Sequence, residues 1–278
     1  MSDVSEVVAL SAKPIILAID TSTERLGVAL LHGDVCAYRH LQLGTGHANQ
    51  VLGVVEELLQ ECGINRAALD AIAVCRGPGG FTGLRIAIGV AQGLALALDR
   101  PVVPVSGLRV LAAAASGFAG PPEPREPREP PESMGATAAT RANAPGPVVA
   151  VIDARMGEFY AAAWKDAAAA WAGAAPLFAE ALLKPESLIE QVGQFVGPGV
   201  IALAAAGGSG KAQVPDGSAE RSRSTLMGAE VEATWPDARV LAWLGRQGLL
   251  AGEGVPAEAA QPVYLRDQVA VPSVVRLP

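Results

Sequence analysis

Two stretches of the chain repeat one pattern of strand, aspartate and second strand. PIILAIDTSTERLGVALL begins at Pro14, and PVVAVIDARMGEFYAAAW begins at Pro147. In each, an apolar run ends in an aspartate, Asp20 or Asp153, and a short polar turn leads into a second apolar run. Self-similarity of this kind indicates an internal duplication. The sequence therefore predicts two related lobes, each opening with the same β-hairpin.

The order of apolar patterns after Pro14 predicts a mixed sheet in the first lobe. Gly33-Asp34 separates two apolar runs and is a two-residue hairpin signal. We expect Thr82 and Ser106 to be N-caps of the helices that follow them. Three antiparallel strands followed by alternating helices and strands are typical of an α/β fold of ribonuclease-H-like type. The expected strands are 13–20, 26–32, 35–41, 70–75 and 101–105, and the expected helices are 47–62, 81–98 and 106–115.

Two segments interrupt the pattern and divide the chain. Residues 117–147 contain proline runs and a short EPR repeat, with almost no large apolar groups, so they cannot offset their ordering entropy by burial. Residues 204–230 are rich in glycine and polar residues. In the second lobe we expect a helix near 185–193, a strand near 194–203 and a helix at 237–250. The predicted division is a flexible extension 1–13, an N-terminal lobe 14–116, a Pro-rich disordered insertion 117–147, and a C-terminal lobe 148–278 with a flexible insertion 204–230.

Composition limits the class of protein. The net charge of −7 argues against this chain alone gripping a phosphate backbone. No 18-residue apolar run is free of polar or charged residues, so we expect no membrane span, and no basic region precedes the short apolar N-terminal stretch. The three cysteines are widely spaced without a metal or redox motif, as expected in a reducing compartment. We therefore expect a cytoplasmic protein.

The stretch RGPGGFTGLR, residues 76–85, lies where a phosphate-binding loop would lie, between an apolar strand and a helix. No lysine follows its last glycine, and its glycine spacing is one residue longer than in a dinucleotide fingerprint. GGSGKA at 207–212 also departs from the P-loop spacing. We predict a tight turn that seats the helix on the sheet, and leave open an anion at the helix start. The residues of this loop site are Gly77, Gly79, Gly80, Thr82 and Gly83.

The helix expected at 81–98 has no polar stripe. A helix that is apolar on all sides must be covered on all sides, either by this chain or by a partner. Gly89 and Gly93, with Ala97, form a ridge of small residues that permits close helix approach. We consider both a fully buried helix and a protein–protein interface formed together with helix 47–62.

Catalytic and metal-binding signals are weak. His32, His40 and His47 form no H-x-x-x-H pair, so the sequence predicts no metal site. Asp20 and Asp153 end strands where α/β enzymes often bind metal or phosphate, but we expect Asp20 to accept hydrogen bonds from the amides of its own turn. We therefore assign no catalytic residue.

Four motifs in order resemble the TsaB (YeaZ) family: ILAIDTSTERLGVAL, RGPGGFTGLRIAIGVAQGLALAL (with Cys75 where the family has a leading glycine), VIDARMGEFYAA and QPVYLRDQVA. The resemblance covers most of 14–115 and 147–200 and the C-terminal tail; the two insertions depart from the compact family pattern. It implies a two-lobed actin/Hsp70-like (ASKHA) fold in a non-catalytic relative of TsaD, the transferase of tRNA N6-threonylcarbamoyladenosine formation. Of the metal-binding histidine pair of TsaD, this sequence offers His47 alone.

The resemblance also implies partners and an interface. The N-terminal lobe would pair with a TsaD-like transferase, or with a second copy when alone, and help recruit a TsaE-like ATPase. Contact with tRNA would come through the complex, no cofactor would be required, and a nucleotide at the partner interface stays open. Two alternatives remain: an ATP-dependent kinase or acyl transferase of the same fold that uses Asp20, and a glycoprotease-like peptidase. The expected interface residues are Val51, Val54, Val55 and Leu58 on one helix and Arg85, Ile86, Gly89, Val90 and Gly93 on the other.

Overall fold

The computed structural model describes residues 13–115, 146–189, 193–206, 223–226, 229–232 and 234–266. The predicted extension 1–13, except Lys13, and the Pro-rich insertion 117–147, except Gly146 and Pro147, lie outside the described residues. So does the end of the chain beyond Arg266.

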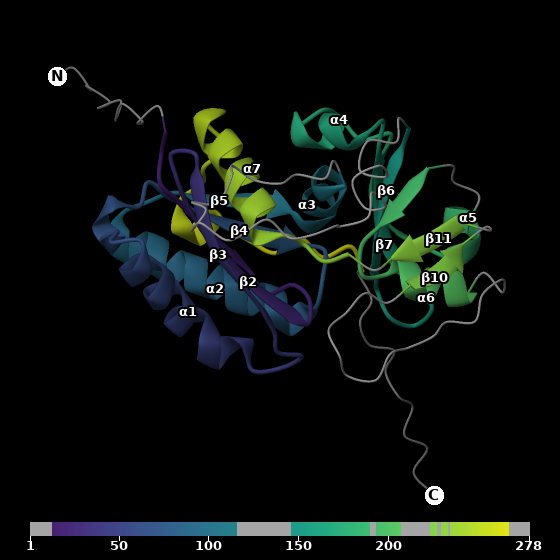
Figure 1. The fold of residues 1–278 in the computed structure, drawn as a ribbon, viewed down its shortest axis with the longest axis horizontal. Helices are drawn as coiled ribbons and strands as arrows, with labels where there is room; N and C mark the ends of the chain where they lie inside the picture. The colour runs from purple at the N-terminus through teal and green to yellow at the C-terminus, as the bar shows by residue number, and fades with distance from the viewer. Residues whose placement is uncertain are drawn as a thin grey trace, which may run out of the picture.

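A five-stranded mixed sheet forms the N-terminal lobe, in the order β3-β2-β1-β4-β5 (Figure 1). β1, β2 and β3 form the predicted antiparallel meander, and β1 pairs with β4 and β4 with β5 in parallel. Gly33 and Asp34 make the expected two-residue turn, because His32 pairs with Val35 across it. The strands are β1 (Ile16–Asp20), β2 (Arg25–His32), β3 (Val35–Gln42), β4 (Ala71–Gly77) and β5 (Val102–Ser106).

Helices cover both faces of this sheet. α1 (His47–Glu61) and α2 (Phe81–Leu98) lie on one face, where their apolar residues join Leu17, Ile19 and Val74 in one core (Figure 1). α3 (Gly107–Ala114) and α7 (Ala238–Leu250) lie on the other. The Ser106 side chain accepts a hydrogen bond from the Arg109 amide, as an N-cap should.

The second lobe repeats the arrangement of the first. Its four-stranded sheet has the order β8-β7-β6-β9, with β6 antiparallel to β7 and parallel to β9, as β1 is to β2 and β4. Its strands are β6 (Val148–Asp153), β7 (Phe159–Trp164), β8 (Phe178–Leu183) and β9 (Gln194–Val196), with helices α4 (Ala167–Trp171), α5 (Pro185–Ile189) and α6 (Val200–Ala206). The duplicated hairpin therefore belongs to a duplicated sheet, and the chain has the mixed α/β, two-lobed architecture that the sequence predicts.

Two parts of the second lobe differ from prediction. The strand expected near 194–203 is three residues long, and α6 follows it, because Val200, Leu203 and Ala204 have helical spacing on its buried side. The helix expected near 185–193 is present over Pro185–Ile189, and residues 190–192 lie outside the described residues. Part of the predicted insertion 204–230 forms a hairpin of β10 (Arg223–Leu226) and β11 (Ala229–Glu232).

Helix α7 comes late in the sequence but packs on the N-terminal lobe. Sequence order predicts that this helix belongs to the C-terminal lobe, but it packs across β1, β2 and β4 of the N-terminal sheet (Figure 1). A Cβ at Gly245 would lie 2.3 Å from the Ala73 Cβ, so glycine is required for this close approach. Between the two sheets, α3 and α7 belong to one core with residues of both lobes.

Candidate partner interface

The glycine loop seats the start of α2 on the turn that follows β1. The Gly80 amide donates to the Ser22 carbonyl oxygen at 2.8 Å, and Thr21 Oγ1 donates to the Gly83 carbonyl oxygen at 2.6 Å. A Cβ at Gly79 would lie 2.7 Å from the Ser22 oxygen, and one at Gly83 would lie 1.9 Å from the Thr21 oxygen. These contacts account for both glycines by close backbone packing, without an anion.

Two other residues of the loop have different roles. Gly77 has a φ of 107°, which favours glycine, and a Cβ there would lie 3.0 Å from the Val263 carbonyl oxygen of the C-terminal segment. Thr82 was predicted to cap α2, but the N-cap is Gly80, which forms no side-chain cap bond. Thr82 is an exposed residue of the first turn.

Asp20 is committed to its own turn. Its Oδ1 accepts a hydrogen bond from the Ser22 amide at 2.7 Å, as predicted, and Asp153 accepts the corresponding bond from the Arg155 amide. Asp20 is only 3% exposed, and burial raises the pKa of its carboxyl group above the usual range. A carboxylate so placed is poorly presented to a substrate or a metal ion, which weighs against a kinase that uses Asp20.

The three histidines of the sequence lie at different places in the N-terminal lobe. His32 is exposed at the end of β2, His40 lies beside the start of α7, and His47 is buried at the start of α1. Within the part of the chain that the structure describes, no group of three or more His, Cys, Asp or Glu side chains could hold a metal ion.

Helix α2 has one buried and one exposed apolar side. Leu84, Ala87, Ile88, Ala91 and Ala95 are buried against the sheet and α1. By length and composition α2 could cross a membrane, and only 28% of it is buried inside the molecule. Helices that are long and apolar also occur in the cores of soluble proteins, but those are mostly buried. The sequence expectation of two covered sides is therefore met on one side only within the described chain.

The exposed side of α2 carries the glycine ridge. Gly89 and Gly93 are exposed, and a Cβ at either would meet nothing within 4 Å. Leu96, on the same side, is 76% exposed. Glycine in the middle of a helix costs about 1 kcal/mol relative to alanine, and the packing of this chain gives no reason for it here.

Arg85 is held at the N-terminal end of this side. Its guanidinium carbon lies 3.8 Å from the centre of the Phe81 ring, and its Nε donates to the Tyr264 hydroxyl at 3.0 Å. The Phe81 and Tyr264 rings are 5.4 Å apart between centroids. The C-terminal segment therefore contributes to the surface that begins α2.

The other expected interface residues divide by burial. Val51, Val54, Val55 and Leu58 are buried in the core beneath α1, so these four cannot form the outer surface of that helix. Ile86 and Val90 are half-buried and pack against the same core. The apolar stripe predicted to be the contact surface of α1 is therefore its buried side.

A shallow apolar groove runs between α1 and α2. It has a volume of about 360 Å³, and Leu52, which is 55% exposed, stands at its edge. The interface residues expected from the sequence do not include four exposed large side chains on this side, Leu52, Phe81, Leu96 and Tyr264. A repeat was visible for α2, because positions 81, 85, 89, 93 and 96 recur every three or four residues and so share one side of the helix. The groove is lined by Leu17, Leu52, Gly53, Val55, Glu56, Leu59, Arg66, Leu69 and Leu94.

The fold and this helix pair define a two-lobed protein of the TsaD/YeaZ-like class. The family model of TsaD, tRNA N6-adenosine threonylcarbamoyltransferase, matches residues 43–128, which contain α1, α2 and α3. A crystal structure of a Pseudomonas aeruginosa protein described as similar to the peptidase YeaZ has a TM-score of 0.65 and 33% sequence identity. That likeness covers 91% of this chain and all of the other.

Curated relatives give the particular family. The tRNA threonylcarbamoyladenosine biosynthesis protein TsaB of Escherichia coli K12 is 36% identical over 257 residues, 92% of this chain and 96% of its own length. The protein of the same name from Haemophilus influenzae is 38% identical over 146 residues, 52% of this chain and 51% of its own length. The chain belongs to the TsaB (YeaZ) family and has a role in the formation of threonylcarbamoyladenosine in tRNA.

Proposed function

We propose that this chain is a non-catalytic scaffold subunit that binds and activates a TsaD-like transferase through the exposed sides of α1 and α2. The observation that carries the proposal is the pair Gly89 and Gly93, which face open space on an apolar, largely exposed helix. Small residues on one helix let a second backbone approach closely, and an exposed apolar surface of this kind is typical of protein–protein contacts.

The remaining partners follow from the same assignment. When the transferase is absent, the same surface joins a second copy of the chain, and in the complex it helps recruit a TsaE-like ATPase. The net charge of −7 supports contact with tRNA through the complex rather than through this chain alone. A nucleotide at the partner interface is compatible with this arrangement, and the protein works in the cytoplasm.

The burial of Asp20 supports a non-catalytic role over an ATP-dependent kinase or acyl transferase. The peptidase alternative has weaker support, because the sequence offers no Ser–His or Cys–His arrangement that we can place. Measuring ATP hydrolysis and bound metal in the isolated protein separates these classes, and appreciable turnover by the isolated chain would contradict the scaffold role.

The direct test combines a pull-down with deletion of the gene. The tagged chain should retain the TsaD-like protein of its own cell, and tRNA from the deletion strain should lack threonylcarbamoyladenosine by nucleoside mass spectrometry. Restoring the wild-type chain should restore the modification. Normal modification in the deletion strain would refute the proposed function.

A further inference from the structure

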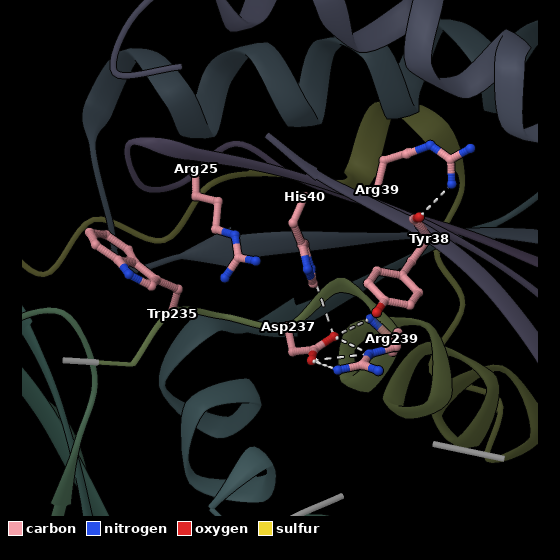
Figure 2. A pocket seen from close by; sticks show the side chains of 7 residues that line it. All are labelled: Arg25, Tyr38, Arg39, His40, Trp235, Asp237 and Arg239. Atoms are coloured by element: carbon pink, nitrogen blue, oxygen red, sulfur yellow. Dashed lines mark hydrogen bonds and ion pairs between the residues drawn. The ribbon is translucent and has the colours of Figure 1, made fainter. Parts of the chain in front are cut away.

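A second concave site lies on the face of the N-terminal sheet opposite to α1 and α2. It has a volume of about 550 Å³, which is in the range of small-molecule sites. β2 and β3 form one wall, and the segment leading into α7 forms the other (Figure 2). The residues that line it are Arg25, Tyr38, Arg39, His40, Trp235, Asp237 and Arg239.

Two of the three arginines in this pocket already have partners. The Arg239 guanidinium donates three hydrogen bonds to the Asp237 carboxylate, from Nη2 to Oδ2 at 2.7 Å and from Nε to Oδ1 at 3.1 Å and to Oδ2 at 3.2 Å, and stacks on the Tyr38 ring. Arg39 points away from the pocket (Figure 2). Its Nη2 donates a hydrogen bond to Glu61 Oε1 at 2.6 Å. Their charges are therefore balanced locally.

The histidine of the pocket is neutral. His40 Nε2 accepts a hydrogen bond from the Ala238 amide at 3.1 Å, so this nitrogen carries no proton. Burial lowers the pKa of His40 to about 4, although the nearby Asp237 acts in the opposite direction. Near neutral pH, His40 neither adds positive charge nor balances an arginine.

Arg25 is the remaining charge. It extends from the start of β2 into the space between the Trp235 and His40 rings (Figure 2). Its guanidinium has no hydrogen bond or ion pair with any residue that the structure describes, although it is half-buried. A partly desolvated guanidinium gains from a counter-ion, and its planar fork matches a carboxylate or phosphate in a two-bond arrangement.

We propose that this pocket binds an oxyanion carried on a flat ring, with the phosphate or carboxylate on Arg25 and the ring against Trp235. An indole offers a large flat face for stacking. The Asp237–Arg239 pair forms the opposite wall, where the arginine balances the carboxylate that would otherwise repel an anion. This inference is independent of the partner interface, which lies across the sheet.

Calorimetric titration with four simple probes tests the site. Phenyl phosphate and benzoate carry a ring with each kind of oxyanion, inorganic phosphate has no ring, and phenol has no oxyanion. We expect at least one of the two ring-bearing anions to bind wild type. The tighter one identifies the oxyanion of the natural ligand. If phenyl phosphate is the tighter of the two, inorganic phosphate should bind about tenfold more weakly, and phenol should not bind.

Three variants locate the binding. Arg25→Met should weaken binding of the anionic probes by tenfold or more and leave the melting temperature unchanged. Arg39→Met is the matched control, because it removes a lining arginine that points away from the pocket, and it should bind as wild type does. Trp235→Leu should reduce phenyl phosphate to the affinity of inorganic phosphate. Absence of binding to wild type, or equal affinity in Arg25→Met, would overturn the proposal.

Discussion

The carbonyl oxygen of Thr21 occupies the space that a side chain at residue 83 would need. A Cβ at Gly83 would lie 1.9 Å from that oxygen, while Thr21 Oγ1 donates to the Gly83 carbonyl oxygen at 2.6 Å. Replacement by Gly83→Ala must therefore displace the start of α2 from the turn after β1. We expect a loss of about 3 kcal/mol in the free energy of unfolding, measured by urea denaturation.

The same helix supplies a matched control for that substitution. Gly89→Ala places a methyl group where nothing lies within 4 Å, and alanine is the better helix former. It should raise the free energy of unfolding by about 1 kcal/mol. Equal effects at residues 83 and 89 would show that helix propensity, rather than the contact with Thr21, determines the result.

Gly89→Leu separates binding from folding. The larger side chain projects from the exposed ridge of α2, so it should block close approach of the transferase while preserving the fold. We expect co-purification of the TsaD-like protein to be lost and the melting temperature to be at least that of wild type. The control is Ala168→Leu, an exposed helical position in α4 of the other lobe. Retention of the transferase by Gly89→Leu would disprove the proposed interface.

Leu96→Lys tests the proposed association of two copies. Leu96 is 76% exposed on the outer side of α2, so a lysine is tolerated in the monomer but would be buried without a partner in a dimer. The dissociation constant from analytical ultracentrifugation should rise tenfold or more. Leu177→Lys, at a 61% exposed site in the other lobe, should leave it unchanged. The idea fails if the two variants dimerise equally well.

His40 should make the protein less stable in mild acid. The unfolded chain binds a proton at His40 near pH 6.5, but the folded chain does so only near pH 4, because burial lowers the pKa. Acidification between these two pKa values therefore favours unfolding. Above pH 6.5 His40 is neutral in both states, and this loss of stability is absent. Between pH 6.5 and 5 this group alone should remove about 1.5 kcal/mol from the free energy of unfolding.

His40→Gln can still accept the hydrogen bond from the Ala238 amide but cannot titrate. The decrease in the free energy of unfolding between pH 6.5 and 5 should therefore be about 1.5 kcal/mol smaller in this variant than in wild type. Urea titrations of wild type and the variant at the two pH values measure this difference. Identical pH dependence in wild type and His40→Gln would refute the assignment.

Periodicity and turn chemistry were sufficient to predict most elements of the first lobe. The Gly33-Asp34 turn and the Ser106 cap depend on contacts within a few residues, which the local sequence records. Thr82 failed as a cap because Gly80 packs on Ser22, a contact between distant parts of the chain. The apolar run VIALAAA fits either a strand or a helix, so α6 could not be predicted from pattern alone.

The surface was harder to predict than the core. Val51, Val54, Val55 and Leu58 share one side of α1, but a stripe alone does not say whether a sheet or a partner covers it. The Tyr264–Arg85 contact joins residues far apart in sequence, so no local signal could reveal it. The Arg25 pocket likewise requires the approach of Trp235 and Asp237 from beyond the second lobe.

The packing of α7 sets an order for assembly during synthesis. The part of the N-terminal sheet that α7 covers, across β1, β2 and Ala73 of β4, stays uncovered until residues 238–250 have left the ribosome. In a truncated chain that ends before α7, helices α1 and α2 would pack on a sheet whose opposite face is partly uncovered. We therefore expect the surface proposed for the transferase to reach its final form only when almost the whole polypeptide has been made, and a chain shortened before α7 to bind the transferase more weakly than the full chain.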